Sequence, residues 1–142
     1  MKQKIPLTLV RNGGLIYPRT DSDYEVLLNL GIPANNLTAD FIPSLLNYLP
    51  SNVKHTIVKF DELEEQMIER FESRWKREVN FTAKAVTLVY SKDTTETLVE
   101  KAVTSLRKWY RGHFYRLEAS EKRSGRSTKL VLTKSLAPRR EV

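Results

Sequence analysis

The side chains of this sequence best suited to bind a ligand are cations, and they are concentrated near the C-terminus. Among the 142 residues, 24 are Lys or Arg and 17 are Asp or Glu, for a formal net charge of +7. Residues 101–142 hold twelve cations and three acids, or 12 − 3 = +9, so residues 1–100 carry 12 − 14 = −2. Ammonium and guanidinium groups neutralise backbone phosphates. This distribution predicts that a polyanion would bind the last third of the chain.

The densest part of this basic region is RGHFYRLEASEKRSGRSTKLVLTK, residues 111–134. Two strand-like runs, 113–119 and 128–134, flank SEKRSGRS, which we expect to be a projecting loop whose glycine allows close approach to a phosphate backbone. A loop that only solubilises a sheet edge is the alternative, and the cations of the preceding helix and the following tail favour binding. The predicted nucleic-acid-binding residues are Arg107, Lys108, Arg111, Phe114, Arg116, Lys122, Arg123, Arg126, Lys129, Lys134, Arg139 and Arg140.

Aromatic residues are interleaved with these cations and could stack on bases. Trp109 and Tyr110 fall on the apolar arc of a predicted helix, so we expect them in the core. If Tyr115 and Leu117 face inward, Phe114 and Arg116 face the other side of the sheet. That pair is the predicted stacking platform.

Catalytic and metal chemistry find little support. The sequence has no cysteine, and its two histidines, His55 and His113, are isolated, which argues against zinc and disulfides. It contains no phosphate-binding glycine loop, HExxH pair or GxSxG elbow, and nothing supports a serine–histidine–carboxylate triad. We therefore expect no catalytic residue, no metal, no cofactor and no enzymatic activity. Four glutamates on a predicted helix could serve a metal-dependent nuclease, but interspersed cations favour a salt-bridged, solvated face: Glu62, Glu65, Glu69 and Glu72.

The N-terminal 50 residues are predicted to form a hairpin and short helices. Asn12-Gly13 between apolar runs indicates a tight hairpin with strands near 5–10 and 14–17. Ser22 with Glu25 fits a capping box of a helix that Gly31 and Pro33 would end. SLLNYL, residues 44–49, could form one or two helical turns.

Residues 51–135 are predicted to form an α+β sandwich, followed by a basic tail at 136–142. VKHTIVKF alternates like a strand, Asp61 with Glu64 makes a capping box of a long helix, and FTAKAVTLVY is predicted to be a central strand. Asp93 with Glu96 forms a third capping box, and the helix it opens would end at Gly112. The hairpin strands follow, so the predicted fold is a β-α-β-α-β-β two-layer sandwich. The first helix should bury Leu63, Met67, Ile68, Phe71, Trp75 and Val79, and the second Leu98, Val99, Ala102, Val103, Leu106, Trp109 and Tyr110.

This order of elements, with GRSTKLVLTKSLAPRR as a basic turn, apolar strand and basic end, resembles the C-terminal domain of bacterial translation initiation factor three and the Alba-type chromatin proteins. The resemblance covers about 80 residues and extends to fold alone. It implies a DNA or RNA partner engaged by the hairpin and the adjacent sheet edge.

A different class of function is a protein-interaction adaptor or scaffold whose basic end only solubilises. Its docking surface would be FIPSLLNYLP, residues 41–50, which could also support a homodimer through Phe41, Ile42, Leu45, Leu46, Tyr48 and Leu49. No apolar run approaches the roughly 20 residues that span a bilayer, and MKQKIPLTLV lacks the apolar stretch of a secretion signal. We therefore expect no membrane partner and a cytoplasmic or nucleoid location, not secretion.

Overall fold

The computed structural model describes residues 3–32, 37–38, 42–75, 78–91 and 93–137. The chain divides into two compact units, Met1–Gln66 and Met67–Val142, and the boundary lies inside a helix. Together they contain four helices and two sheets, one mixed and one antiparallel, so the α+β class is confirmed for the described residues.

The N-terminal unit is a mixed sheet in the order β3-β2-β1-β4 with two short helices. Strands β1 and β2 form the predicted hairpin, whose turn contains Gly13 at φ 58°. The helix predicted at 44–49 is also confirmed. The elements are β1 (Ile5–Asn12), β2 (Leu15–Pro18), α1 (Asp21–Asn29), β3 (Leu37–Thr38), α2 (Ile42–Tyr48) and β4 (Val53–Lys59).

Helix α1 is capped two residues earlier than predicted. Its N-cap is Thr20, which forms a capping box with Asp23, in place of the Ser22 and Glu25 pair. The Asp23 carboxylate accepts hydrogen bonds from the Thr20 backbone N–H (3.1 Å) and hydroxyl (2.6 Å), and from the Thr8 backbone N–H of β1 (2.8 Å). This last bond links α1 to the sheet. Ser22 and Thr20 are both favourable N-cap residues, and the contact of Asp23 with β1 explains why the helix begins after Thr20.

One core cluster of this unit lies on the face of its sheet that carries Leu7 and Leu9, and Val10 and Tyr17 of the opposite face are also 0% exposed. Leu7 and Leu9 of β1 pack there with Leu27 of α1 and Leu45 of α2. Because Leu45 is 1% exposed and Leu49 packs against the same cluster, residues 41–50 do not form one continuous exposed apolar patch. Tyr48 is 74% exposed, whereas Phe41 and the side chain of Ile42 lie outside the described residues.

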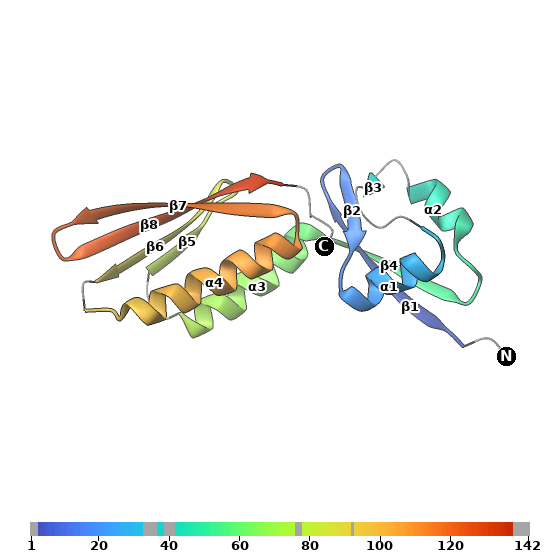
Figure 1. Ribbon diagram of the computed structural model, residues 1–142, viewed down its shortest axis with the longest axis horizontal. Helices are drawn as coiled ribbons and strands as arrows, with labels where there is room; N and C mark the ends of the chain where they lie inside the picture. The colour runs from blue at the N-terminus through green and yellow to red at the C-terminus, as the bar shows by residue number, and fades with distance from the viewer. Residues whose placement is uncertain (1–2, 33–36, 39–41, 76–77, 92, 138–142) are drawn as a thin grey trace. The chain divides into compact units, whose positions relative to one another are not determined.

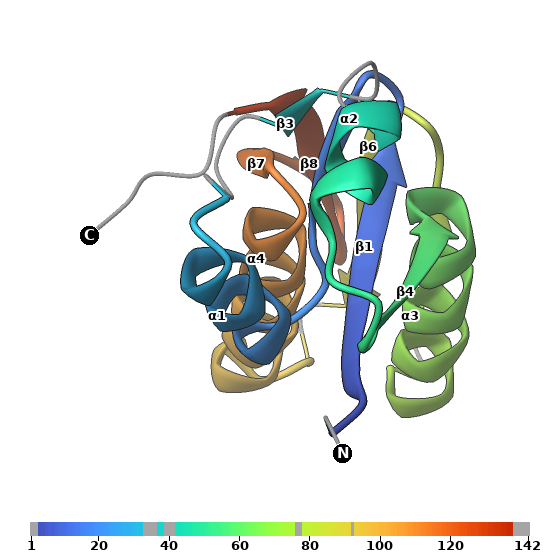
Figure 2. The same ribbon diagram turned by 90° about the vertical axis from the view of Figure 1, so that its right-hand side faces the viewer.

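Strand β4 has a different partner from the one its place in the sequence indicated. It pairs in parallel with β1, with Leu9 opposite Ile57, so it belongs to the N-terminal sheet and not to the C-terminal sandwich (Figure 2). Accordingly, the unit boundary falls after Gln66 and not near residue 51. Alternating apolar residues predict a strand and its buried face, but they do not select the neighbouring strand.

The C-terminal unit is an antiparallel sheet in the order β5-β6-β8-β7, with α3 and α4 on one side (Figure 1). The predicted central strand is split into β5 and β6 by a turn in which the Thr82 N–H donates to the Ala85 carbonyl, and only β6 lies inside the sheet. Helix α3 (Phe60–Arg74) crosses the boundary between the units, and the other elements are β5 (Glu78–Phe81), β6 (Ala85–Ser91), α4 (Glu96–Gly112), β7 (Tyr115–Ser124) and β8 (Ser127–Leu136).

The helix-covered face carries the core of this unit. Val86, Leu88 and Leu132 are 0% exposed. Phe71 of α3 contacts Phe81 with ring centroids 5.8 Å apart, and Tyr110 of α4 contacts Tyr115 at 6.1 Å. The opposite face has no helix over it in the described structure, and we call it the open face (Figure 1).

The two helices match their predicted apolar arcs better than their predicted caps. In α4, Val99, Ala102, Leu106 and Tyr110 are buried, whereas Leu98 is 44% exposed. The N-cap is Thr95 without a side-chain cap bond, so the predicted Asp93–Glu96 box is absent. Helix α3 already begins at Phe60, which places Asp61 inside its first turn, and Val79 of its predicted face lies in β5.

Candidate nucleic-acid interface: the hairpin and helix α4

The predicted basic loop is almost entirely strand. Strands β7 and β8 pair without a bulge from Tyr115–Leu136 to Ser124–Ser127, so only Gly125 and Arg126 form the turn. Gly125 has φ 61°, as required at the first central position of a type II′ turn. Strand β8 also pairs with β6 as far as Ser127. The hairpin is therefore part of the sheet and does not project as a separate arm, and β7 is an edge strand.

Strand pleating separates the hairpin cations onto two faces. Thr128 and Leu130 are buried on the helix-covered face, so the intervening Lys129 points to the open face. Lys122 lies directly opposite Lys129 and shares that face. Arg123, opposite Thr128, lies on the helix-covered side. The four cations are thus close in space but are divided between the two sides of the sheet.

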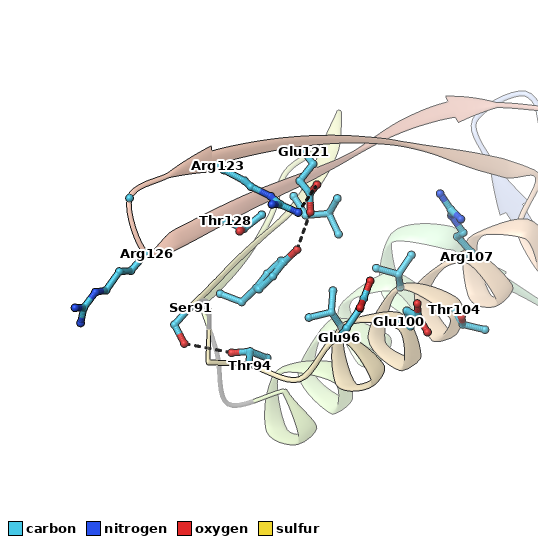
Figure 3. Close-up of a pocket in the computed structure, with 15 residues that line it drawn as sticks. Ser91, Thr94, Glu96, Glu100, Thr104, Arg107, Glu121, Arg123, Arg126 and Thr128 are labelled. Carbon is cyan, nitrogen blue, oxygen red and sulfur yellow. Dashed lines mark hydrogen bonds and ion pairs between the residues drawn. The ribbon is translucent and has the colours of Figure 1, made fainter.

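A polar groove of about 700 Å³ lies between the N-terminal half of α4 and the distal end of the hairpin (Figure 3). We call it the α4–hairpin groove. The apolar core ends here, because polar residues replace apolar ones at the inward positions of the distal strands. Its lining includes three arginines, Arg107, Arg123 and Arg126, and three glutamates, Glu96, Glu100 and Glu121. With equal numbers of each sign, the groove is formally balanced in charge.

Where the sheet lines this groove, Glu121 of β7 interacts with side chains of β6 and of β7 itself. The Tyr90 hydroxyl donates to Glu121 Oε1 at 3.0 Å, and Arg123 Nη2 lies 3.9 Å from Glu121 Oε2. The Arg123 side chain is 80% exposed, so this ion pair contributes little to stability. Burial, followed by the hydrogen bond and negative charge of Glu121, raises the pKa of Tyr90 above its ordinary value.

Helix α4 adds a second group of cations. Arg107, Lys108 and Arg111 are exposed, with Arg111 in the last turn, where a cation interacts favourably with the helix dipole. Arg107 also lines the α4–hairpin groove. In Figure 3 its side chain extends from α4 toward the hairpin. Arg107 is therefore the cation of α4 that lines the same groove as Arg123 and Arg126 of the hairpin.

The predicted stacking platform is wrong. Phe114 precedes β7, adopts a left-handed backbone conformation with φ 69° and is 4% exposed, so its ring belongs to the core. Arg116 is exposed and lies opposite Ser135 on the open face. Tyr110 is 0% exposed as predicted, whereas Trp109 is only half-buried, with its ring centroid 4.1 Å from that of His113.

Lys134 is also unsuited to the predicted role. It is half-buried on the helix-covered face, with Nζ 5.1 Å from the centroid of the Tyr110 ring. This cation–π contact directs its charge into the protein. Arg139 and Arg140 lie outside the described residues.

Among the described residues, no group of His, Asp or Glu is suitably placed to hold a metal ion. No helix in the described part of the chain is long and apolar enough to cross a membrane. Comparison of the chain with protein-family models, with curated proteins and with solved structures found no match.

Sequence reasoning missed the α4–hairpin groove and its Tyr90–Glu121 contact. These residues are 31 positions apart and meet because β6 and β7 both flank β8. A signal was present in the alternation of β7, where Glu121 and Arg123 continue the inward row of Leu117. Polar residues at inward positions indicate that the core does not extend to the end of the strands.

Proposed function

We propose that this protein binds the phosphate backbone of nucleic acid through the tip of the β7–β8 hairpin, with the C-terminal turns of α4 as a second contact, and that it has no enzymatic activity. The observation that carries the proposal is the direct pairing of Lys122 with Lys129 on the open face. Like charges directly opposite one another on neighbouring strands are destabilising. An anionic partner offsets that cost.

The neighbouring charges support an extended anion. Arg123 and Arg126 lie within the same hairpin tip, and Glu121 is the one acidic residue adjoining them in the sequence. Arginine guanidinium groups can bind phosphate through two parallel hydrogen bonds, while lysines act as flexible point charges. Arg107 faces the same tip across the α4–hairpin groove. A polyanion that follows the hairpin could therefore contact cations of both elements.

The charge balance of the groove favours the hairpin tip over the groove interior. Glu96, Glu100 and Glu121 would repel a phosphate placed between them. On the open face, by contrast, Glu118 is the one acidic residue of β7 and lies four positions from Lys122, about 13 Å along the strand. We therefore assign backbone contact to the rim and open face of the tip. Because phosphates carry no base information, the proposal covers DNA and RNA alike.

The test is the salt dependence of binding to fluorescent oligonucleotides, single-stranded and duplex, each in two unrelated base compositions. Phosphate neutralisation releases counterions, so log K should fall with log salt concentration by about 0.9 per contact on a duplex. We expect a slope magnitude of about 4–7 and similar affinity for the two compositions. Undetectable binding, or an affinity insensitive to salt, would contradict the proposal.

A further inference from the structure

The outer edge of β7 has no partner strand in the described structure. β7 is the last strand of the order β5-β6-β8-β7, and it is ten residues long. Its residues from Glu118 to Ser124 are exposed on both faces. It contains no proline, and its regular pairing with β8 leaves no bulge. Proline, bulges and charged side chains are the usual protection of an exposed edge, and β7 has the charged side chains alone, so its backbone can accept a strand whose charges complement its own.

We propose that a second copy of this chain occupies that edge, with the two β7 strands antiparallel about a two-fold axis at Ser120. A two-fold axis perpendicular to the sheet keeps the open faces of both copies on the same side. Residues equally distant from Ser120 then lie opposite one another. Glu118 of each copy therefore faces Lys122 of the other, and both residues are on the open face.

The charges of β7 favour this register over its neighbours. Centring the axis on Glu118, Glu121 or Lys122 would place that charged residue opposite itself, and centring it on Ala119 would oppose Arg116 to Lys122. Centring it on Ser120 gives two Glu118–Lys122 pairs and no directly opposed like charges. Opposite charges in direct register stabilise a strand pair, and like charges destabilise it.

This assembly is compatible with the proposed nucleic-acid contact and does not depend on it. Lys122 would lie between Lys129 of its own chain and Glu118 of the second copy, which offsets part of the repulsion between the two lysines and leaves the charge of Lys129 for an anion. Arg123, Arg126 and Lys129 of each copy stay available for phosphates. The two four-stranded sheets would join through their β7 strands into one continuous sheet. The open faces of the two copies would lie next to each other on the same side of that sheet.

Single-cysteine variants of the full chain test the register, because the parent sequence has no cysteine. In the proposed dimer the two Ser120 Cα atoms lie about 4.5–5.5 Å apart, within the range of a disulfide. The matched control Ser124→Cys places its two Cα atoms about 27 Å apart. With oxidised glutathione and no nucleic acid, Ser120→Cys should form a crosslinked dimer at least about tenfold faster than Ser124→Cys. Equal rates would overturn the proposal.

Charge exchange provides the second measurement, by light scattering of variants without cysteine. Lys122→Glu alone should weaken the dimer about tenfold or more, since both opposite-charge pairs become like-charge pairs. The double variant Glu118→Lys/Lys122→Glu restores both pairs and should restore the dimer. A monomeric parent chain at all concentrations, or a double variant no better than the single one, would overturn the assignment. The assignment would also be overturned if the backbone amides of β7 were protected from hydrogen exchange only after a different protein is added, because the edge would then bind that protein and not a second copy.

Discussion

The variant Arg126→Gln/Lys129→Gln removes two hairpin-tip cations that have no part in the proposed β7 pairing. Within the described structure neither side chain forms an ion pair, and Lys129 faces the like charge of Lys122. Exposed substitutions usually change stability by no more than about 0.5 kcal/mol. Because removing Lys129 relieves repulsion, the free energy of unfolding should stay unchanged or increase slightly. The fold should survive this change.

Binding should respond much more strongly than stability. Each lost phosphate contact removes about 0.9 from the salt slope on a duplex, so two contacts remove about 1.8. At about 0.1 M salt this corresponds to roughly 60-fold weaker binding if counterion release is the main term. The loss should be similar for unrelated base sequences, since phosphates carry no base information.

A control variant that loses the same charge elsewhere distinguishes direct contacts at the hairpin tip from a general effect of the protein's net charge. Lys84 lies in the turn before β6, about 20 Å along the sheet from the hairpin tip. Arg74 ends α3, and neither residue lines the α4–hairpin groove. Arg74→Gln/Lys84→Gln should retain most of the affinity and nearly all of the salt slope. Anisotropy titrations and thermal melts on both variants are the assay. Equal losses in the two variants would refute the assignment of contacts to the tip, as would parental binding by Arg126→Gln/Lys129→Gln.

Three further results are expected. Asp23→Ala should lower the free energy of unfolding of the N-terminal unit by about 2–4 kcal/mol in urea melts, because it removes the Asp23 half of the capping box and leaves the backbone N–H groups of Thr20 and Thr8 without their acceptor. Tyr110→Ala should lower the free energy of unfolding by about 3–5 kcal/mol in the same assay, and Trp109→Ala should lower it clearly less, because Trp109 is only half-buried. Equal losses for the two variants would contradict this difference in burial. Burial and then Glu121 raise the pKa of Tyr90 above 10.0, so the contact stabilises the fold below pH 10 and is lost as the pH rises through the raised pKa. Alkaline melts of Tyr90→Phe should therefore show a shallower loss of stability above pH 10 than the parent.

The features that the sequence determined by itself are local ones. Glycine between runs of strand-like residues predicts both hairpins, because few other residues adopt a positive φ at low cost, although the length of the second turn was not predicted. The spacing of Val99, Ala102, Leu106 and Tyr110 predicts the buried stripe of α4, because a helix repeats every 3.6 residues. The segregation of cations to the last third is a property of the sequence alone.

The tertiary structure decided which segments meet. The alternation in β4 is equally suited to either sheet, and its pairing with β1 was settled by the N-terminal core to which Val53 and Ile57 contribute. Phe114 and Lys134 both belong to the basic region by sequence. In the structure, Phe114 has a left-handed backbone conformation and its ring is buried in the core, whereas Lys134 makes a cation–π contact with the ring of Tyr110. Local periodicity determines which side of an element is apolar, whereas its neighbours are chosen by contacts between residues far apart in the chain, whose energies no short segment contains.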